Sequence, residues 1–209
     1  MRRSKKLIVT ALFLIGACIL LYPAVSNKLA ERHQAEMISR YEQTVEELPK
    51  TDMKSEWEKA VKYNESVTGM SVEDPFILGS GSVLPGNYKD VLNVEEKEGV
   101  MGYIEIPAID VMLPIYHGVS ERVLRRGVGH METTALPIGG KGTHSVLASH
   151  RGLSTAKLFT DLDRMKEGYL FYIHVLDHLL TYEVDQISVI EPEDTDALRP
   201  IADKEYITL

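Results

Sequence analysis

The pattern of hydrophobic and polar positions divides the chain into three parts. Residues 1–27 join a basic tip to an apolar run without charged side chains at 7–27. Residues 28–98 show helical spacing and then a loop, and residues 99–209 alternate between short apolar runs and turn residues. A helix needs about 20 apolar residues to cross a bilayer, so 7–27 is long enough for a transmembrane anchor. We expect an anchor, a helical region and a β domain, in that order.

The region after the anchor predicts two amphipathic helices. The first runs from residue 28 to about residue 48, where Pro49 ends it. The second is predicted over residues 52–64, with Met53, Trp57 and Val61 on one face. We expect the two helices to pack together as a hairpin. Residues 68–98 follow as a loop rich in Gly and Pro, and its apolar content indicates that it covers another part of the protein.

The remainder of the chain is predicted to be mainly β. Many short strands separated by turns, with two short helices, are typical of a β-barrel. The predicted strands are 101–107, 111–116, 143–149, 169–176, 179–190 and a last one that begins at 205; residues 134–138 are expected to form a hairpin with 143–149, and the helices are expected at 120–127 and 155–168.

Charge is distributed unevenly along the chain. The first six residues carry four positive charges; without them, 19 basic and 31 acidic residues leave a net charge of −12. Such an acidic surface argues against nucleic acid as a partner and against docking of the main domain on anionic lipid. The basic tip is expected to stay in the cytoplasm, with the acidic domain outside and with lipid contact through residues 7–27. A cleaved signal peptide and, from Ile15 to Cys18, a lipoprotein cleavage box are the alternatives that we weigh against the anchor.

Candidate chemistry is sparse. Gly139–Thr143 has the Gly and Lys of a phosphate loop, but Gly142 follows the lysine, so a tight turn is expected. His144 and His150 would share one face of a strand, but nothing nearby completes a metal site, so we expect no metal and no cofactor. Ser145 and Ser149 do not stand in a nucleophile elbow. Cys18, the single cysteine, lies inside the predicted anchor.

The other histidines suggest no site. His33, His174 and His178 are interpreted as surface or turn residues, whereas His117 and His130 could line the barrel. On sequence chemistry alone, a histidine at a strand end, such as His150, is more often structural than catalytic.

Two stretches change this interpretation of His150. The first is G-Y-I-E-I-P-A-I-D-V-M-L-P-I-Y-H-G and the second is G-V-G-H-M-E-T-T-A-L-P-I-G-G-K-G-T-H-S-V-L-A-S-H-R-G. From Gly102 to Leu209 the chain resembles the sortases, the cysteine transpeptidases of Gram-positive cell surfaces. The resemblance implies a β-barrel that holds a catalytic histidine, cysteine and arginine, and His150 in S-H-R-G matches the histidine. Arg151 does not match the arginine, which the family carries on its final strand.

The resemblance implies a chemistry and a subclass. The cysteine thiolate attacks an L-P-x-T-G-like sorting signal of a surface protein, and the histidine acts as general acid and base. The helical extension and the D-P-F segment (Asp74, Pro75, Phe76) resemble class C, whose lid plugs the active site and whose acceptor is a pilin lysine. We therefore expect pilins, or other surface proteins with a C-terminal sorting signal, as partners.

The sequence departs from the family pattern at its end. The family's cysteine closes a T-L-x-T-C motif, and Thr208 and Leu209 are the last two residues here. The cysteine and arginine are expected beyond Leu209, through a frameshift or a partial gene, so this chain is expected to be inactive and its incomplete barrel poorly stable. A wall-anchoring sortase and a non-catalytic, membrane-anchored binding module are the alternative functions.

Overall fold

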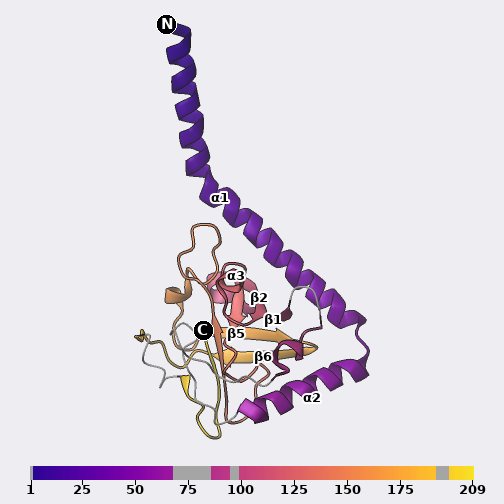
Figure 1. Ribbon diagram of the computed structural model, residues 1–209. Helices are drawn as coiled ribbons and strands as arrows, with labels where there is room; N and C mark the ends of the chain where they lie inside the picture. Colours follow the sequence, from indigo (N-terminus) through magenta and orange to yellow (C-terminus); the bar gives the residue numbers. More distant parts are fainter. Residues whose placement is uncertain (1, 68–85, 95–98, 192–197) are drawn as a thin grey trace.

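The computed structural model describes residues 2–67, 86–94, 99–191 and 198–209, and Figure 1 shows a β domain that carries one long helix. The helices and strands are α1 Arg2–Glu47, α2 Lys50–Val67, β1 Val100–Ile106, β2 Val111–His117, α3 Glu121–Leu124, β3 Val128–His130, β4 Thr143–Ala148, β5 Leu170–Val175, β6 His178–Glu183 and β7 Glu205–Thr208, with 3-10 turns η1 Tyr88–Asp90, η2 Pro107–Ile109 and η3 Leu162–Arg164.

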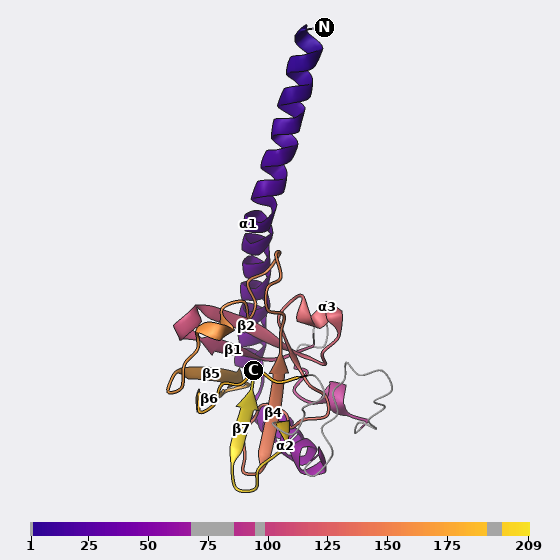
Figure 2. The same ribbon diagram turned by 90° about the vertical axis from the view of Figure 1, so that its left-hand side faces the viewer.

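The helix α1 runs without a break from the basic tip to Glu47 and continues through Pro23. Its N-terminal half stands away from the rest of the protein (Figures 1 and 2), and one segment is apolar enough and long enough to cross a membrane. Its C-terminal half turns one face to the barrel. On this face the Tyr41 hydroxyl donates to the Met101 carbonyl at 3.1 Å and accepts from the Leu176 amide at 2.8 Å. One buried tyrosine therefore joins the long helix to the barrel.

The helix α2 is longer than predicted, and its buried face differs from the predicted one. Ala60, Tyr63 and Asn64 are buried, whereas Val61 is 37% exposed. From Trp57 the buried face continues at Ala60, three residues later, and not at Val61, four residues later. Both spacings keep residues on one side of a helix, so the sequence pattern permits either. Figure 1 shows α1 and α2 diverging from the turn between them, and the apolar faces of α2 and of the C-terminal half of α1 pack against the barrel.

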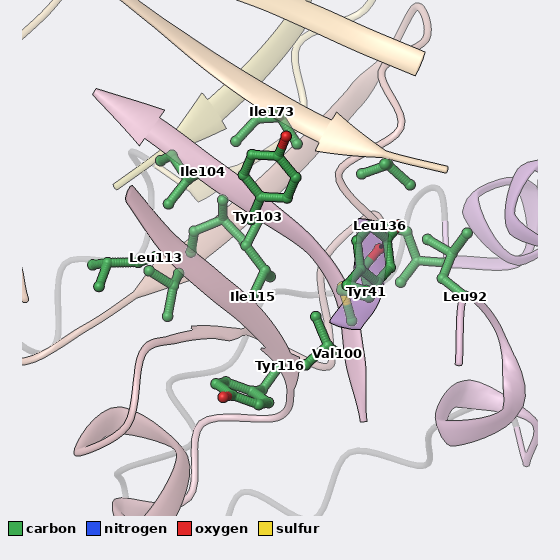
Figure 3. Packing of buried hydrophobic residues seen from close by; sticks show 14 of the residues in the cluster. Tyr41, Leu92, Val100, Tyr103, Ile104, Leu113, Ile115, Tyr116, Leu136 and Ile173 are labelled. Atoms are coloured by element: carbon green, nitrogen blue, oxygen red, sulfur yellow. Dashed lines mark hydrogen bonds between the residues drawn. The ribbon is translucent and has the colours of Figure 1, made fainter. Parts of the chain in front are cut away.

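Seven strands form one strongly curled sheet in the order β6-β5-β1-β2-β3-β4-β7. Most neighbours are antiparallel, but β2 pairs with β3 and β4 pairs with β7 in parallel. The curl brings the two edge strands together. The Tyr182 hydroxyl of β6 donates to the Glu205 carboxylate of β7 at 2.7 Å. The predicted mainly-β fold is confirmed as a nearly closed barrel. Figure 3 shows how Ile104, Ile115 and Ile173 fill its interior.

Three predicted elements were wrong, each for a tertiary reason. Residues 134–138 form no strand; β3 pairs with the C-terminal end of β4, and Pro137 lacks the amide hydrogen that a ladder requires. Residues 155–168 form turns and η3 in place of a helix, because Leu158 adopts a positive φ of 43°. The strand predicted to reach residue 190 ends at Glu183, since its partner β5 begins at Leu170.

Candidate active site

His150 lies two residues beyond the end of β4, at a fixed point of the backbone. The Ser149 hydroxyl donates to the Gly127 carbonyl at 2.7 Å, and the His150 carbonyl accepts from the Phe159 amide at 3.2 Å. These bonds on both sides of the chain hold the turn after the strand. The imidazole itself stays one-third exposed, so it is both positioned and accessible.

The His150 side chain has an acidic partner that the sequence analysis missed. Its Nε2 lies 3.2 Å from Glu121 Oε2, and the other carboxylate oxygen accepts from Arg125 Nε at 2.7 Å. The hydrogen bond from Arg125 lowers the pKa of Glu121, and His150 lowers it further, so the carboxylate is ionised at neutral pH. In the sequence, Glu121 only marks the first turn of a helix, and no local signal connects it with a residue 29 positions later.

Arg151 points to a different partner. Its guanidinium forms an ion pair with Asp163 at 2.8 Å, between the turn after β4 and η3. This contact orders the loop that follows His150.

The strand β7 runs parallel to β4 and points in the direction of His150. Thr143 pairs with Glu205 and Val146 pairs with Thr208, a constant offset of 62 residues. The pairing starts at the far end of β4 and proceeds toward its C-terminal end. Parallel pairing thus directs the end of β7 at the residue that the sequence analysis selected.

The neighbouring His144 has a structural environment. It is buried, its Nδ1 lies 3.2 Å from the Arg199 carbonyl, and its Nε2 lies 2.8 Å from the Thr208 hydroxyl. Burial lowers the pKa of His144, so the ring is neutral at pH 7. It ties β7 to β4 and to the segment before β7.

The histidines expected to line the barrel belong to a second network. His130 is fully buried; its Nδ1 accepts from the Tyr88 hydroxyl at 2.9 Å, and its Nε2 lies 2.8 Å from the Ala135 carbonyl. Burial lowers the pKa of His130 to about 4. The His117 ring bridges the Val91 and Gly99 carbonyls. The two rings thus fasten the chain on either side of residues 95–98 to the barrel.

Two histidines interpreted as surface or turn residues make ring contacts. His174 lies within β5, stacks on Tyr103 at a centroid distance of 4.1 Å and pairs with Glu105 at 3.2 Å. His178, at the start of β6, stacks on Trp57 of α2 at 3.8 Å. The simple surface interpretation was therefore wrong for His174.

The remaining candidates are not brought together with His150. Among the described residues, no group of three or more His, Cys, Asp or Glu side chains could hold a metal ion. Cys18 lies on the exposed N-terminal half of α1. The Ser149 hydroxyl is occupied by Gly127, as given above. Asp74, Pro75 and Phe76 lie outside the described residues, so the lid remains a prediction.

Known proteins are similar to this chain in sequence. The sortase domain family matches residues 104–209. Sortase A of Streptococcus agalactiae is 32% identical over 114 residues, which cover 53% of this chain and 45% of that protein, and sortase A of Listeria monocytogenes is 26% identical over 93% of this chain and 78% of its own length.

Solved structures are similar over more of the chain. The crystal structure of Streptococcus pneumoniae sortase C superposes with a TM-score of 0.73 at 40% identity, covering 82% of this chain and 85% of that one. Streptococcus agalactiae sortase C1 gives a TM-score of 0.71 at 37% identity, covering 79% and 84%. With a family match over half of its length and this structural likeness, the chain belongs to the sortase family, which are cysteine transpeptidases.

Proposed function

We propose that this chain acts as a class C sortase that joins pilin subunits, with His150 as its general acid and base. Residues 7–27 would anchor it in the membrane, with the N-terminus in the cytoplasm and the barrel outside. Support for the subclass comes from the similar solved structures, which are sortases C; that of Streptococcus pneumoniae has been described for its pilin substrate specificity. Support for the orientation comes from the four positive charges in front of residue 7.

One observation carries the assignment of His150: the register between β4 and β7. With the offset of 62 residues, a continuation of β7 would bring the third position after Leu209 alongside His150. In the family motif T-L-x-T-C, Thr208 and Leu209 match the first two letters, and the cysteine is the third position after them. The register and the motif therefore agree on the same neighbour for His150.

The proposed chemistry divides transfer into two steps. The thiolate attacks the Thr–Gly carbonyl of the sorting signal, and the C–N bond breaks as His150 protonates the departing glycine amine. His150 then takes a proton from the pilin lysine amine, which attacks the thioester carbonyl and releases the thiolate. Proton and electron pair balance over the two steps, so no cofactor is required.

In this proposal, Glu121 is a positioning residue. A neutral imidazole has one N–H and one lone pair. With Nε2–H donating to Glu121, Nδ1 is the nitrogen that accepts and returns the proton. Arg125 in turn holds the carboxylate. The arrangement is similar in logic to a catalytic triad, where a carboxylate fixes the tautomer of the histidine.

The decisive test begins with the nucleotides that follow the codon of Leu209, read in all three frames. If one frame continues with a cysteine at the third position, this chain extended by that continuation would be expressed as one polypeptide. The extended protein would then be tested for transfer of an L-P-x-T-G peptide to a pilin lysine. We expect His150→Ala to reduce transfer by about 10²- to 10⁴-fold, and His33→Ala, at an exposed position of α1, to leave it unchanged. Transfer to a cell-wall amine in place of lysine would overturn the class C assignment.

The same proposal predicts the behaviour of the 209-residue chain alone. Its single thiol is Cys18 in the predicted anchor. A substrate-like thiol probe should therefore label nothing on the barrel side of the membrane. Labelling of this chain by such a probe from outside would overturn the proposed source of the thiolate.

The lid is a further part of the proposal. The described residues on either side of 68–85 are anchored: Val67 and Tyr88 are buried. Replacing Asp74, Pro75 and Phe76 by alanine in the cysteine-containing protein should speed the reaction of the thiol with a small reagent. An unchanged rate would contradict the lid.

A further inference from the structure

The barrel begins to contact α1 where the uncharged run ends. The large apolar side chains between Leu7 and Tyr22 are exposed, whereas Ser26 and Asn27 are already partly buried. Gln34 then donates from its side chain to the Arg126 carbonyl at 3.2 Å. A helix rises 1.5 Å per residue, so Gln34 lies about 10 Å along α1 from Asn27. The barrel is therefore held within about 10 Å of the end of the apolar run.

The end of the barrel that lies nearest to this run also carries the candidate site. Figure 2 shows the β4 and β7 arrows pointing toward the end from which the N-terminal half of α1 leaves, with α3 beside it, while α2 lies toward the opposite end. His150 follows β4 and contacts Glu121 at the start of α3. The histidine and the short helix thus face the side from which the apolar segment projects.

Basic side chains gather at this end of an otherwise acidic domain. Arg122, Arg125 and Arg126 follow one another in and after α3, and Arg126 lies 3.4 Å from His33 of α1, next to the exposed Arg32. Arg125 is 60% exposed although it binds Glu121. The chain without its basic tip has a net charge of −12, so this cluster reverses the prevailing sign. We call Arg32, Arg122, Arg125 and Arg126 the arginine end.

We propose that the arginine end rests on the outer surface of the membrane and binds the phosphate groups of anionic lipids. This inference rests on the proposed function, because it takes residues 7–27 as the spanning segment and the barrel as external. The polar layer on each side of a bilayer is about 5–7 Å thick, and the long arginine side chains bridge the remaining distance. Guanidinium groups donate in a fork that fits phosphate.

Two consequences follow for the reaction. The continuous helix sets the height of the barrel, and the lipid contact sets its tilt, so His150 is held facing the lipid headgroups. A peptide bond that reacts at His150 must then lie at the membrane surface. This docked orientation favours substrates that are still tethered to the same membrane over proteins that are free in solution.

The experiment uses the full chain in lipid nanodiscs with a fluorescent label. Cys18→Ala first removes the native thiol. A new cysteine then carries the label, either at the arginine end (Ser120→Cys) or, as the matched control, on α2 (Ser55→Cys). Lipids with a quencher on the headgroup report proximity to the surface. We expect strong quenching at position 120 in discs with phosphatidylglycerol, weaker quenching there in phosphatidylcholine discs, and little quenching at position 55.

A charge-matched pair of variants tests the lipid contact. One variant neutralises the three exposed members of the arginine end, with Arg32→Gln, Arg122→Gln and Arg125→Gln. The other neutralises three exposed lysines of α2, with Lys54→Gln, Lys59→Gln and Lys62→Gln. Each basic residue near an anionic surface strengthens docking about fivefold, so the arginine variant should lower the docked-to-undocked ratio about a hundredfold. The lysine variant should leave quenching at position 120 unchanged.

The outcomes separate this inference from the anchor on which it rests. If the chain elutes apart from the discs, the proposed anchor fails. If the chain stays in the discs but position 120 is no more quenched than position 55, the docked orientation is overturned. Equal quenching at position 120 in both lipids, insensitive to the arginine variant, overturns lipid binding.

Discussion

Acidification should destabilise the barrel through one buried histidine, and the size of the effect can be worked from the structure. His130 is fully buried and neutral, with Nδ1 accepting from Tyr88 and Nε2 donating to the Ala135 carbonyl. Burial lowers its pKa to about 4 from 6.5, and the nearby His117 acts in the same direction. The unfolded chain therefore takes up a proton at a higher pH than the folded chain does.

The sign and magnitude follow from this difference. Because the folded pKa is depressed, the stabilisation is complete above pH 6.5 and is lost as the pH falls toward 4. Linkage gives about 2 kcal/mol lost between pH 7 and pH 5 and about 3 kcal/mol by pH 4. We choose the step from pH 7 to pH 5 because most carboxylates still stay ionised there.

Urea unfolding of the full chain in detergent, followed by the emission of Trp57, measures this loss. The single tryptophan is suited to the purpose because it stacks on His178 across α2 and β6. His130→Gln should be less stable at pH 7 but should lose about 2 kcal/mol less on the step to pH 5. The exposed control His33→Gln should retain the full loss. An equal loss in the wild type and in His130→Gln would refute the argument.

Three substitutions test how the elements are joined, each by the change in unfolding free energy. Tyr41→Phe leaves two buried backbone groups without their hydroxyl partner and should cost about 2–4 kcal/mol; a cost below about 0.5 kcal/mol would contradict the role of Tyr41. Asn64→Ala strips both hydrogen bonds from the Leu136 backbone and should cost a similar amount. Gly102→Ala would bring a methyl group to 2.4 Å from the His174 carbonyl oxygen, so β1 and β5 must separate. This should lower the unfolding free energy by about 1–3 kcal/mol; unchanged stability would show that β1 and β5 separate without cost.

The elements predicted well from sequence are those whose pattern is local. A short apolar run indicated β1 and alternating apolar residues indicated β5, each within one residue of its ends, because a strand half-covered by a core, as β5 is, needs period 2. The uncharged run indicated an apolar helix. His150 was selected through motif resemblance, and its catalytic role stays a prediction, whereas family and barrel are confirmed by comparison with known proteins.

Pairing between distant segments was decided only by the tertiary structure. The parallel contact of β4 with β7, the hydrogen bond from His150 to Glu121, and the bond from Gln34 to the Arg126 carbonyl join residues 62, 29 and 92 positions apart. Residues 134–138 had the composition of a strand and still formed none: β3 pairs with the C-terminal end of β4, and only the Ala135 amide donates to the His144 carbonyl. The local pattern fixes which face of an element is apolar. The partner that covers this face depends on the packing of the whole chain, in which distant segments compete for the same hydrogen bonds and the same buried surface.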